Sequence, residues 1–411
     1  MNFLYRILVW KAQIVLSIIA LFNKKIRLFV NGRKETFHKL EQAISLKDEV
    51  IWMHAASLGE FEQGRPIVEK LKEKYPEKKL VISFFSPSGY EIRKNYNLAD
   101  VVCYLPLDSK SKTKRFLKIV HPELVIIVKY EFWPNLLNEL KQINTKTILV
   151  SGIFRKQQSF FKWYGGWMRK FLNAFEHFFV QDENSKSLLN SIGFQNVSVS
   201  GDTRFDRVFE ITKQNNQLEF IEEFKNNQHT VVVGSSWPDD EKVLVDYINN
   251  QASEDEKFII APHNIKLDQI QELKQSIKRK TVLFSEKEGK NLSEFQVLIV
   301  DTIGILTKIY SYANVAYVGG GYTKSGVHNV LEPATFGNPI VIGPNFKKFN
   351  EAIELVQNEA CFTVDNSKKL SVLLKKFYQD KSELQKVGDK ALNYVVSNKG
   401  ATSKILNYLE K

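Results

Sequence analysis

Cysteine is scarce in this chain, and its scarcity argues against a disulfide-built fold or a cysteine-ligated metal centre. The 411 residues include two cysteines, Cys103 and Cys361, which lie far apart in the apolar contexts VVCYL and EACFTV. Such residues are typical of buried free thiols in a reducing compartment. The sequence also lacks short-period repeats and low-complexity segments, and its 43% apolar and 25% charged residues indicate a folded globular protein.

Acidic residues are too few to balance the basic ones. Lysine and arginine number 58 against 46 aspartates and glutamates, which gives a formal net charge of +12. This excess predicts an anionic partner, which is nucleic acid, an acidic membrane surface or a phosphorylated substrate. No zinc-finger spacing, RNP-like aromatic motif or helix-turn-helix pattern stands out, so we expect no nucleic-acid partner.

The N-terminal segment 3–22 is apolar, but Arg6 and Lys11 interrupt it. It has no small-residue cleavage site, which argues against a removed signal peptide. Three interpretations stay open: a single-span anchor, an amphipathic helix lying in the membrane interface, or a helix of a soluble core. The basic cluster after it, Lys24, Lys25 and Arg27, predicts that the rest of the chain lies on the cytoplasmic side.

Short apolar runs alternate with helical patterns twice along the chain. The first series of runs covers 50–57, 79–85, 123–128, 146–152 and 177–181, and the second covers 229–236, 257–263, 280–285, 295–301, 315–321 and 338–344. A polar segment, 205–228, lies between them and has the composition of a linker. The pattern predicts an α/β protein with two Rossmann-like lobes facing a cleft, and a single large sheet is the alternative. We expect an N-terminal membrane-associating helix over 1–25, a first lobe over 26–210 and a second over 211–411.

Three charged residues follow predicted strands of the first lobe, where ligands of such sheets bind. Glu60 lies at a helix start in ASLGE, as either a general base or a helix-capping carboxylate. Glu131, in KYEFWPN, either binds a hydroxyl or cation or forms a structural ion pair under an aromatic lid. Arg204, in GDTRFD, either neutralises a leaving phosphate or pairs with Asp202 or Asp206.

The second lobe carries the strongest motif, GGGYTKSGVHNVLEPATFGNPIVIGP, at residues 319–344. A strand, a glycine-rich turn and a helix start predict a phosphate cradle of backbone amides. Glu332, one turn into that helix, is suited to accept hydrogen bonds from ribose hydroxyls. The motif matches neither the GxGxxG dinucleotide fingerprint nor a Walker A sequence.

Taken together, this motif and the segments ASLGE, EFWPN, GDTRFD, APH and DTIG resemble the Kdo (3-deoxy-D-manno-octulosonic acid) transferase family, in the family's order and spacing. The resemblance covers essentially the whole chain and implies the two-lobed GT-B fold. It implies that Glu60 is the proton acceptor and that Glu131 and Arg204 stabilise the transition state. It assigns the cytidine monophosphate (CMP) part of the donor to a set of second-lobe residues: Pro262, His263, Ile303, Gly304, Ile305, Asn329, Val330, Leu331 and Glu332.

The chain departs from the family pattern at four positions. It has Arg204 where the family commonly has lysine, His263 where it often has arginine, Ile305 where it often has glutamate, and Lys129 where an acidic residue is frequent. These departures concern the details of donor binding and leave the predicted fold unchanged.

The function implied by the resemblance is inverting transfer of Kdo from CMP-Kdo to a lipid A precursor (lipid IV-A) in lipopolysaccharide biosynthesis. The implied setting is the anionic cytoplasmic surface of the inner membrane. The leaving group carries one phosphate and the sequence has no Asp-x-Asp motif, so we expect neither metal nor cofactor. The alternatives are a GT-B glycosyltransferase for another nucleotide sugar, or a non-catalytic membrane-bound protein that binds a sugar nucleotide or a lipid. The basic, aromatic segment 155–179 is either a second membrane contact or a helix packed on the first lobe's core.

Overall fold

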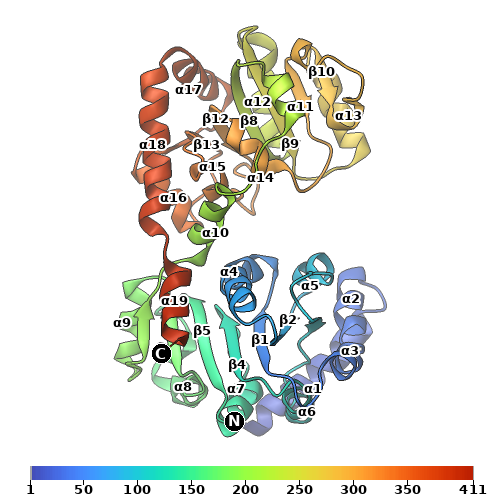
Figure 1. Ribbon diagram of the computed structural model, residues 1–411, viewed down its shortest axis with the longest axis vertical. Coiled ribbons are helices and arrows are strands. Elements are labelled where there is room, and N and C mark those ends of the chain that lie inside the picture. Colours follow the sequence, from blue (N-terminus) through green and yellow to red (C-terminus); the bar gives the residue numbers. More distant parts are fainter. Residues whose placement is uncertain (1, 411) are drawn as a thin grey trace. The chain divides into compact units, whose positions relative to one another are not determined.

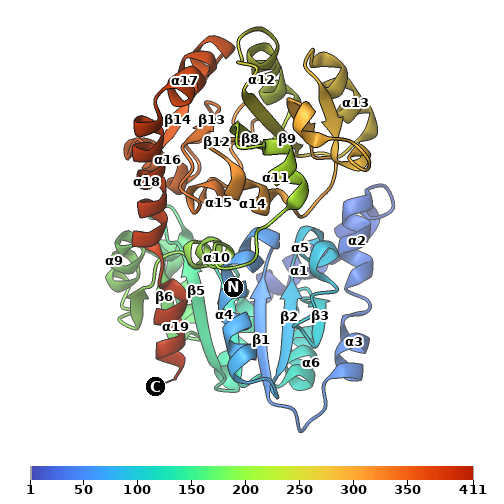
Figure 2. The same ribbon diagram turned by 45° about the horizontal axis from the view of Figure 1, so that its top comes forward.

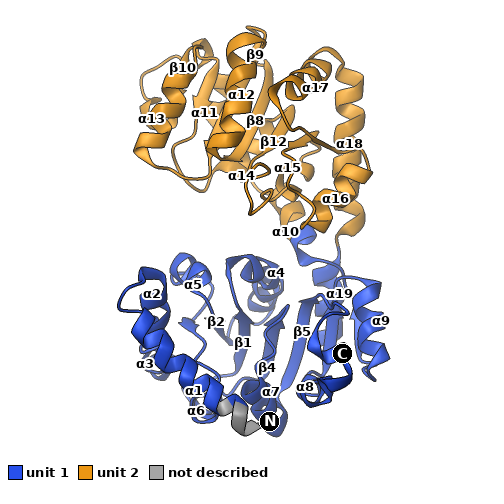
Figure 3. Ribbon diagram, turned by 180° about the vertical axis from the view of Figure 1, so that it is seen from behind, with its two compact units in different colours: residues 1–206, 400–411 blue, residues 207–399 orange. Residues whose placement is uncertain are grey.

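The computed structural model describes the backbone of residues 2–410 and the side chains of residues 5 and 7–410. The chain divides into two compact units, residues 1–206 with 400–411 (unit 1) and residues 207–399 (unit 2), coloured separately in Figure 3. Each unit is built on its own seven-stranded sheet, and every strand pair is parallel. The predicted pair of α/β lobes is therefore confirmed, and the single large sheet is wrong.

Unit 1 begins with three helices and then alternates strands with helices (Figure 1). Its strands are β1 (Val50–Ala55), β2 (Lys79–Phe84), β3 (Val101–Tyr104), β4 (Leu124–Val128), β5 (Lys146–Gly152), β6 (His177–Val180) and β7 (Val197–Val199). Its helices are α1 (Asn2–Ile19), α2 (Lys24–Gly32), α3 (Thr36–Ala43), α4 (Leu58–Lys74), α5 (Pro87–Arg93), α6 (Lys110–Val120), α7 (Pro134–Gln142), α8 (Gly166–Leu172), α9 (Glu183–Ser191) and α19 (Ala401–Leu409), with 3-10 turns η1 (Ser159–Phe161) and η2 (Trp163–Gly165). Helix α10 (Thr203–Ile211) crosses from unit 1 into unit 2.

Helices cover both faces of the unit 1 sheet because alternate side chains of each strand point to opposite faces. Val50 and Trp52 of β1 pack with α3, α6, α7, α8 and α9, whereas Ile51 and Met53 pack with α4, α5 and α19. The strand order is β3-β2-β1-β4-β5-β6-β7, and Figure 2 shows β2 and β3 on one side of β1 with β5 and β6 on the other. The sheet therefore has its topological switch between β1 and β4.

Unit 2 repeats this plan with the order β10-β11-β9-β8-β12-β13-β14 and its switch between β8 and β12. Its strands are β8 (His229–Ser236), β9 (Glu256–Pro262), β10 (Thr281–Leu283), β11 (Val297–Ile299), β12 (Val315–Val318), β13 (Ile340–Ile342) and β14 (Cys361–Thr363). Its helices are α11 (Glu219–Lys225), α12 (Pro238–Asn250), α13 (Leu267–Ser276), α14 (Leu306–Ile309), α15 (Leu331–Ala334), α16 (Asn350–Gln357), α17 (Ser367–Gln379) and α18 (Lys381–Asn398), with 3-10 turns η3 (Phe284–Glu286), η4 (Leu292–Glu294) and η5 (Tyr310–Tyr312).

Two expectations about chain organisation need correction. Residues 400–411, expected in the second lobe, belong to unit 1, because Ile405 of α19 is fully buried in the core that α4 forms on the first sheet. Asp206 fastens the start of this segment, since its carboxylate accepts from the backbone amides of Gly400 (2.5 Å) and Thr402 (2.7 Å). The segment 205–228 holds helices α10 and α11 instead of an open linker, and Phe224 is buried in unit 2.

Helix α1 exposes a row of large apolar side chains. Trp10, Ile14 and Ile18 are 63%, 42% and 55% exposed, and Phe22 just beyond the helix is 86% exposed. Within the described residues, no helix is both long and apolar enough to cross a membrane. Arg6, one of the two charges that interrupt the N-terminal run, lies outside the described side chains.

The aromatic segment 155–179 is predicted to be either a second membrane contact or a helix packed on the first lobe's core, and it contains both exposed and buried aromatic side chains. Phe160 and Phe175 are buried in the core beneath the sheet, whereas Trp163 and Tyr164 are 93% and 56% exposed. Cys103 and Cys361 are free and buried, as predicted, and burial raises the pKa of the Cys103 thiol to about 12.

Candidate functional site

The predicted residues of unit 1 gather at the carboxyl ends of its strands. Glu60 lies in the first turn of α4, after β1, and Glu131 follows β4, the neighbouring strand at the topological switch. Arg204 lies in the first turn of α10, after β7. Parallel α/β sheets bind ligands at such a switch because the flanking loops diverge there and leave a crevice.

The Glu60 carboxylate folds back onto the start of its own helix. One oxygen, Oε2, accepts from the backbone amide of Ala56 at 2.5 Å, which is the capping contact allowed for in the sequence. Partial burial raises the pKa of Glu60, and the negative charge of Glu131 raises it further, against the lowering effects of the Ala56 amide, His54 and Lys129. A carboxylate with a raised pKa is a stronger proton acceptor, so the capping contact and the base role are compatible.

Glu131 is held by a buried hydrogen-bonded chain. Its Oε2 accepts from Trp133 Nε1 at 2.7 Å and lies 3.1 Å from Nε2 of His54, which is fully buried in β1. Burial alone would raise the pKa of Glu131, but the hydrogen bond and charge of His54, with the Trp133 contact, leave it lowered. Glu131 is therefore an anion with a fixed orientation.

His54 is in turn held by a hydrogen bond to Ser83, which also contacts Trp52. Its Nδ1 lies 2.8 Å from Ser83 Oγ, which accepts from Trp52 Nε1 at 2.8 Å. The sequence prediction overlooked His54, and its signal was one ionisable residue within the otherwise apolar strand VIWMHA. A histidine that orients a carboxylate from behind is a common support for a working acid or base.

Arg204 already has an ion-pair partner. Its Nε and its Nη2 lie 2.8 and 2.7 Å from Oδ2 of Asp202, so the structural alternative for Arg204 is present. With the amide of Gln63 oriented toward its donors, its oxygen accepts from Arg204 Nε at 3.3 Å and from Lys129 Nζ at 3.2 Å. This amide therefore links Arg204 to the cation that precedes the Glu131 loop. The Arg204 side chain is 30% exposed, which leaves part of the guanidinium accessible to an anion.

In unit 2, Asp240 organises the glycine-rich turn that follows β12. Its carboxylate is fully buried and accepts from the backbone amides of Gly320 (2.8 Å) and Trp237 (3.0 Å) and from the Tyr317 hydroxyl (2.8 Å). Gly320 has φ +91°, and a Cβ there would lie 2.6 Å from the carbonyl oxygen of Gly326. The turn therefore needs glycine at this position, and Asp240 ties it to the loop after β8, on the other side of the switch. The sequence prediction missed Asp240, which lies within the acidic helix start PDDE.

Three rings form a stacked group beside this turn. Trp237 and His328 lie nearly coplanar, at 3°, with the indole Nε1 donating to His328 Nε2 at 2.9 Å. The ring of His263 stacks on both, with centroid distances of 4.8 Å to Trp237 and 4.4 Å to His328. Burial and the neighbouring His263 lower the pKa of His328 to about 4, so its imidazole is neutral at physiological pH. His263 is thus held in a fixed plane on the loop after β9.

The remaining predicted donor residues lie on two loops that meet at Glu332. Its Oε1 accepts from Asn329 Nδ2 and its Oε2 from Thr307 Oγ1, both at 3.0 Å. Thr307 belongs to the helix that follows the predicted segment 303–305, where Ile303 is 87% exposed and Gly304 has φ +96°. The side chains of Val330 and Leu331 are buried, so of these two residues only the backbone is suited to meet a ligand. The structure therefore brings 303–305 and 329–332 together within unit 2.

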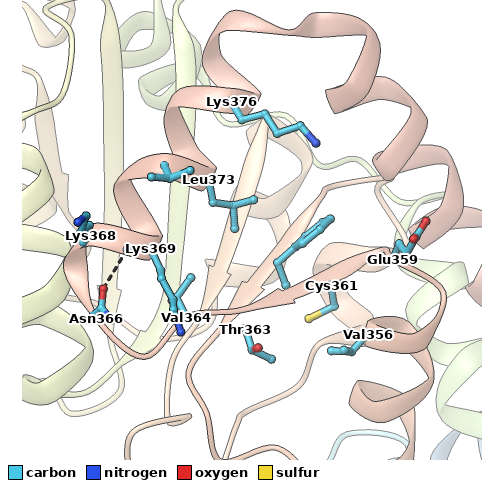
Figure 4. A pocket seen from close by; sticks show the side chains of 12 residues that line it. Val356, Glu359, Cys361, Thr363, Val364, Asn366, Lys368, Lys369, Leu373 and Lys376 are labelled. Carbon is cyan, nitrogen blue, oxygen red and sulfur yellow. Dashed lines mark hydrogen bonds between the residues drawn. The ribbon is translucent and has the colours of Figure 1, made fainter.

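A cavity of about 690 Å³ opens elsewhere in unit 2, between the edge strand β14 and α17 (Figure 4). Its lining includes Cys361, Thr363, Asn366 and Lys369 and none of the predicted donor residues. The cavity lies away from the topological switch, so it is no part of the candidate site.

The chain is similar to transferases of one family. The family described as 3-deoxy-D-manno-octulosonic-acid transferase (kdotransferase) matches residues 31–207. The 3-deoxy-D-manno-octulosonic acid transferase of Aquifex aeolicus is 29% identical, with 82% of this chain and 88% of that protein covered. A bifunctional glycosyltransferase/methyltransferase of Fusobacterium nucleatum is 28% identical over 86% of this chain, which spans 56% of that relative's length.

A solved structure shares the fold. UDP-GlcNAc 2-epimerase from Neisseria meningitidis, bound to UDP-GlcNAc, matches with a TM-score of 0.60 at 15% identity, covering 88% of this chain and 99% of the epimerase. The likeness extends across both units, and it concerns the architecture alone.

Proposed function

We propose that this chain, which is similar to 3-deoxy-D-manno-octulosonic acid (Kdo) transferases, moves Kdo from CMP-Kdo to a lipid A precursor, lipid IV-A. The observation that carries this proposal is the placement of Glu60 and Glu131 at the switch of unit 1. Glu60 combines a raised pKa with a fixed position, and Glu131 is a buried, oriented anion beside it.

The proposed reaction is a direct displacement with inversion at the anomeric carbon. Glu60 takes the proton from the acceptor hydroxyl as that oxygen attacks, and CMP departs with the bonding electrons. Arg204 meets the negative charge that develops on the departing phosphate. Glu131 supports the positive charge that grows on the sugar ring, because it stays ionised beside the reacting centre.

For the donor, we propose that CMP lies on the loops after β8, β9, β11 and β12. Glu332 faces the ribose hydroxyls, and Asn329 holds its carboxylate in place. Pro262, His263 and the backbone of 303–305 and 330–331 complete the site. His263 replaces an arginine frequent in the family, and its stack on Trp237 gives it a flat, oriented surface for the nucleotide.

The test is mass spectrometry of the lipid product after incubation with CMP-Kdo and lipid IV-A. The expected product carries added Kdo, and Glu60→Gln lowers turnover by about 10²- to 10⁴-fold, the usual contribution of a general base. Glu73→Gln is the matched control, because Glu73 lies on the same helix with a 70% exposed side chain. A folded Glu60→Gln enzyme with wild-type turnover would show the base assignment to be wrong.

Competition binding of nucleotides to the protein tests the identity of the donor. CMP is expected to bind more tightly than UDP or GDP. The Glu332→Gln variant is expected to bind CMP more weakly than the wild type. A preference for UDP or GDP would favour a GT-B enzyme for another nucleotide sugar. A protein that binds CMP-Kdo and lipid but never yields product would be the non-catalytic alternative.

We further propose that the protein works at the cytoplasmic surface of the inner membrane. The support is the exposed apolar row of α1, followed by Lys24, Lys25 and Arg27, together with the exposed Trp163. Deleting residues 1–25, or replacing Ile18 and Phe22 by serine, is expected to release the protein from membranes. Unchanged membrane recovery of both variants would point instead to the segment 155–179.

A further inference from the structure

A cationic cavity of unit 1 lies outside the residues assigned so far. It has a volume of about 280 Å³ and opens between α1, α2, α3 and the loop before α6. Arg33, Lys34 and Lys112 line it together with apolar side chains, namely Leu16, Phe29, Val30, Phe37 and Leu107. A second cavity of about 610 Å³ shares Gln13 and Lys112 with the first and adds Trp10, Lys110 and Lys114.

Arg33 is a half-buried cation with no carboxylate partner among the described residues. No carboxylate of the described residues lies within ion-pair distance of its guanidinium, which donates to the carbonyl oxygens of Phe29 (2.9 Å) and Phe85 (2.7 Å). Its Nε is buried and has no hydrogen-bond partner among the described residues. Burial lowers the pKa of Arg33 to about 9, although its guanidinium also lies 3.6 Å from the centroid of the Phe29 ring. A buried charge with an unused donor is destabilising unless an anion completes it.

Lys112 is a further cation of the same cavity. It donates to Gln13 Oε1 at 3.1 Å, and burial together with the charge of Arg33 lowers its pKa. The nearby Asp108 does not neutralise these cations. Its carboxylate instead accepts from the backbone amides of Asn135 and Leu136 at 2.9 Å each, at the start of α7. Among the described residues, the lining of this cavity therefore includes three cations and no carboxylate.

We propose that this cavity binds the phosphate group of a lipid, with Arg33 and Lys112 as its ligands. The guanidinium and ammonium groups supply charged donors that match phosphate oxygens. The apolar lining and the adjoining exposed row of α1 suit the start of an acyl chain, which inorganic phosphate lacks.

The site connects directly to the predicted catalytic group. Arg33 donates to the carbonyl of Phe85, whose ring stacks on Trp133 at 4.8 Å, and Trp133 donates to Glu131. If the chain is a Kdo transferase as proposed, a phosphate bound here holds the lipid near Glu131, with the rings of Phe85 and Trp133 between them. The binding itself does not depend on turnover, so failure of this inference and failure of the proposed function are distinguishable.

Calorimetry with dihexanoyl phosphatidic acid, below its micelle concentration and with the full chain, tests the proposal. We expect saturable one-to-one binding, weakened about tenfold or more by Lys112→Gln, since a charged hydrogen bond is lost. Lys118→Gln is the matched control on the same helix, because Lys118 is exposed and outside both cavities. Arg33 bonds two backbone carbonyls and its replacement could unfold the unit, so Lys112 carries the test.

Two outcomes would overturn the proposal. One is absent binding, or binding that Lys112→Gln and Lys118→Gln weaken equally, because neither result requires this cavity. The other is inorganic phosphate binding as tightly as the lipid, because the apolar lining would then contribute nothing.

Discussion

Replacing Asp240 by asparagine should loosen the glycine-rich turn of unit 2. The carboxylate is fully buried and serves three donors, the amides of Gly320 and Trp237 and the Tyr317 hydroxyl. An asparagine side chain of the same shape has one oxygen, and its amide nitrogen must face at least one of these donors. With the oxygen facing the two amides, the amide nitrogen faces the Tyr317 hydroxyl, whose proton loses its acceptor, and all three contacts lose the charge.

The expected magnitude follows from those three contacts. An unsatisfied buried donor costs about 1–3 kcal/mol, and a charged acceptor adds about 1 kcal/mol over a neutral one. Burial raises the pKa of Asp240, so removing the charge recovers part of its desolvation cost. A net loss of about 2–4 kcal/mol corresponds to a fall of roughly 5–15 °C in the melting temperature of a domain of this size.

Differential scanning calorimetry and CMP titration measure the two consequences. The unit 2 transition of Asp240→Asn should move to lower temperature. CMP should also bind more weakly, because the turn proposed to hold its phosphate has lost part of its support. Tyr317→Phe is the control, since it removes one donor, keeps the charge and should cost about 1 kcal/mol. An Asp240→Asn variant with both wild-type stability and wild-type CMP affinity would refute the reasoning.

Three further perturbations test the site. Glu131→Gln should lower the pKa of Glu60 by removing a nearby negative charge, so the acid limb of the kcat/KM profile should move to lower pH; an unmoved limb would contradict the coupling. His328 has a pKa lowered from 6.5 to about 4, so the unfolded state takes up a proton first as the pH falls. Unit 2 should therefore lose on the order of 3 kcal/mol of unfolding free energy as the pH falls from 6.5 to about 4. Urea titrations at several pH values measure this loss, which should be smaller in the His328→Gln variant. Gly320→Ala should destabilise unit 2 by about 1–3 kcal/mol more than Gly289→Ala, because a Cβ at Gly289 meets nothing within 4 Å; equal losses would argue against the crowded turn.

The sequence predicted the interior of each sheet and missed most of its edges. The central strands β1, β4, β8 and β9 are long apolar runs because helices bury both of their faces. The edge strands β3, β7 and β14 contain three or four residues, as in VSV and CFT, and such short runs give no distinct pattern. Residues 400–411 were assigned to the wrong unit because an amphipathic helix does not specify which core it covers.

For the site, the sequence located the loops and missed their supports. Glu60, Glu131 and Glu332 follow strands at the two switches, where the order of strands makes polar residues conspicuous. Their supports, His54 and Asp240, come from other elements and become visible only when the chain is folded. The roles assigned to the predicted residues stay predictions until the variants above are measured.

The return of the chain to unit 1 through α19 constrains the order in which the protein matures during synthesis. Unit 2 is one continuous segment, residues 207–399, and can form its sheet as soon as that segment has been made. Unit 1 lacks the helix that supplies Ile405 and satisfies Asp206 until residues 400–411 follow. Domains fold as units while the ribosome elongates the chain. The last segment of unit 1 is synthesised after all of unit 2, so part of one face of the unit 1 sheet stays uncovered until then.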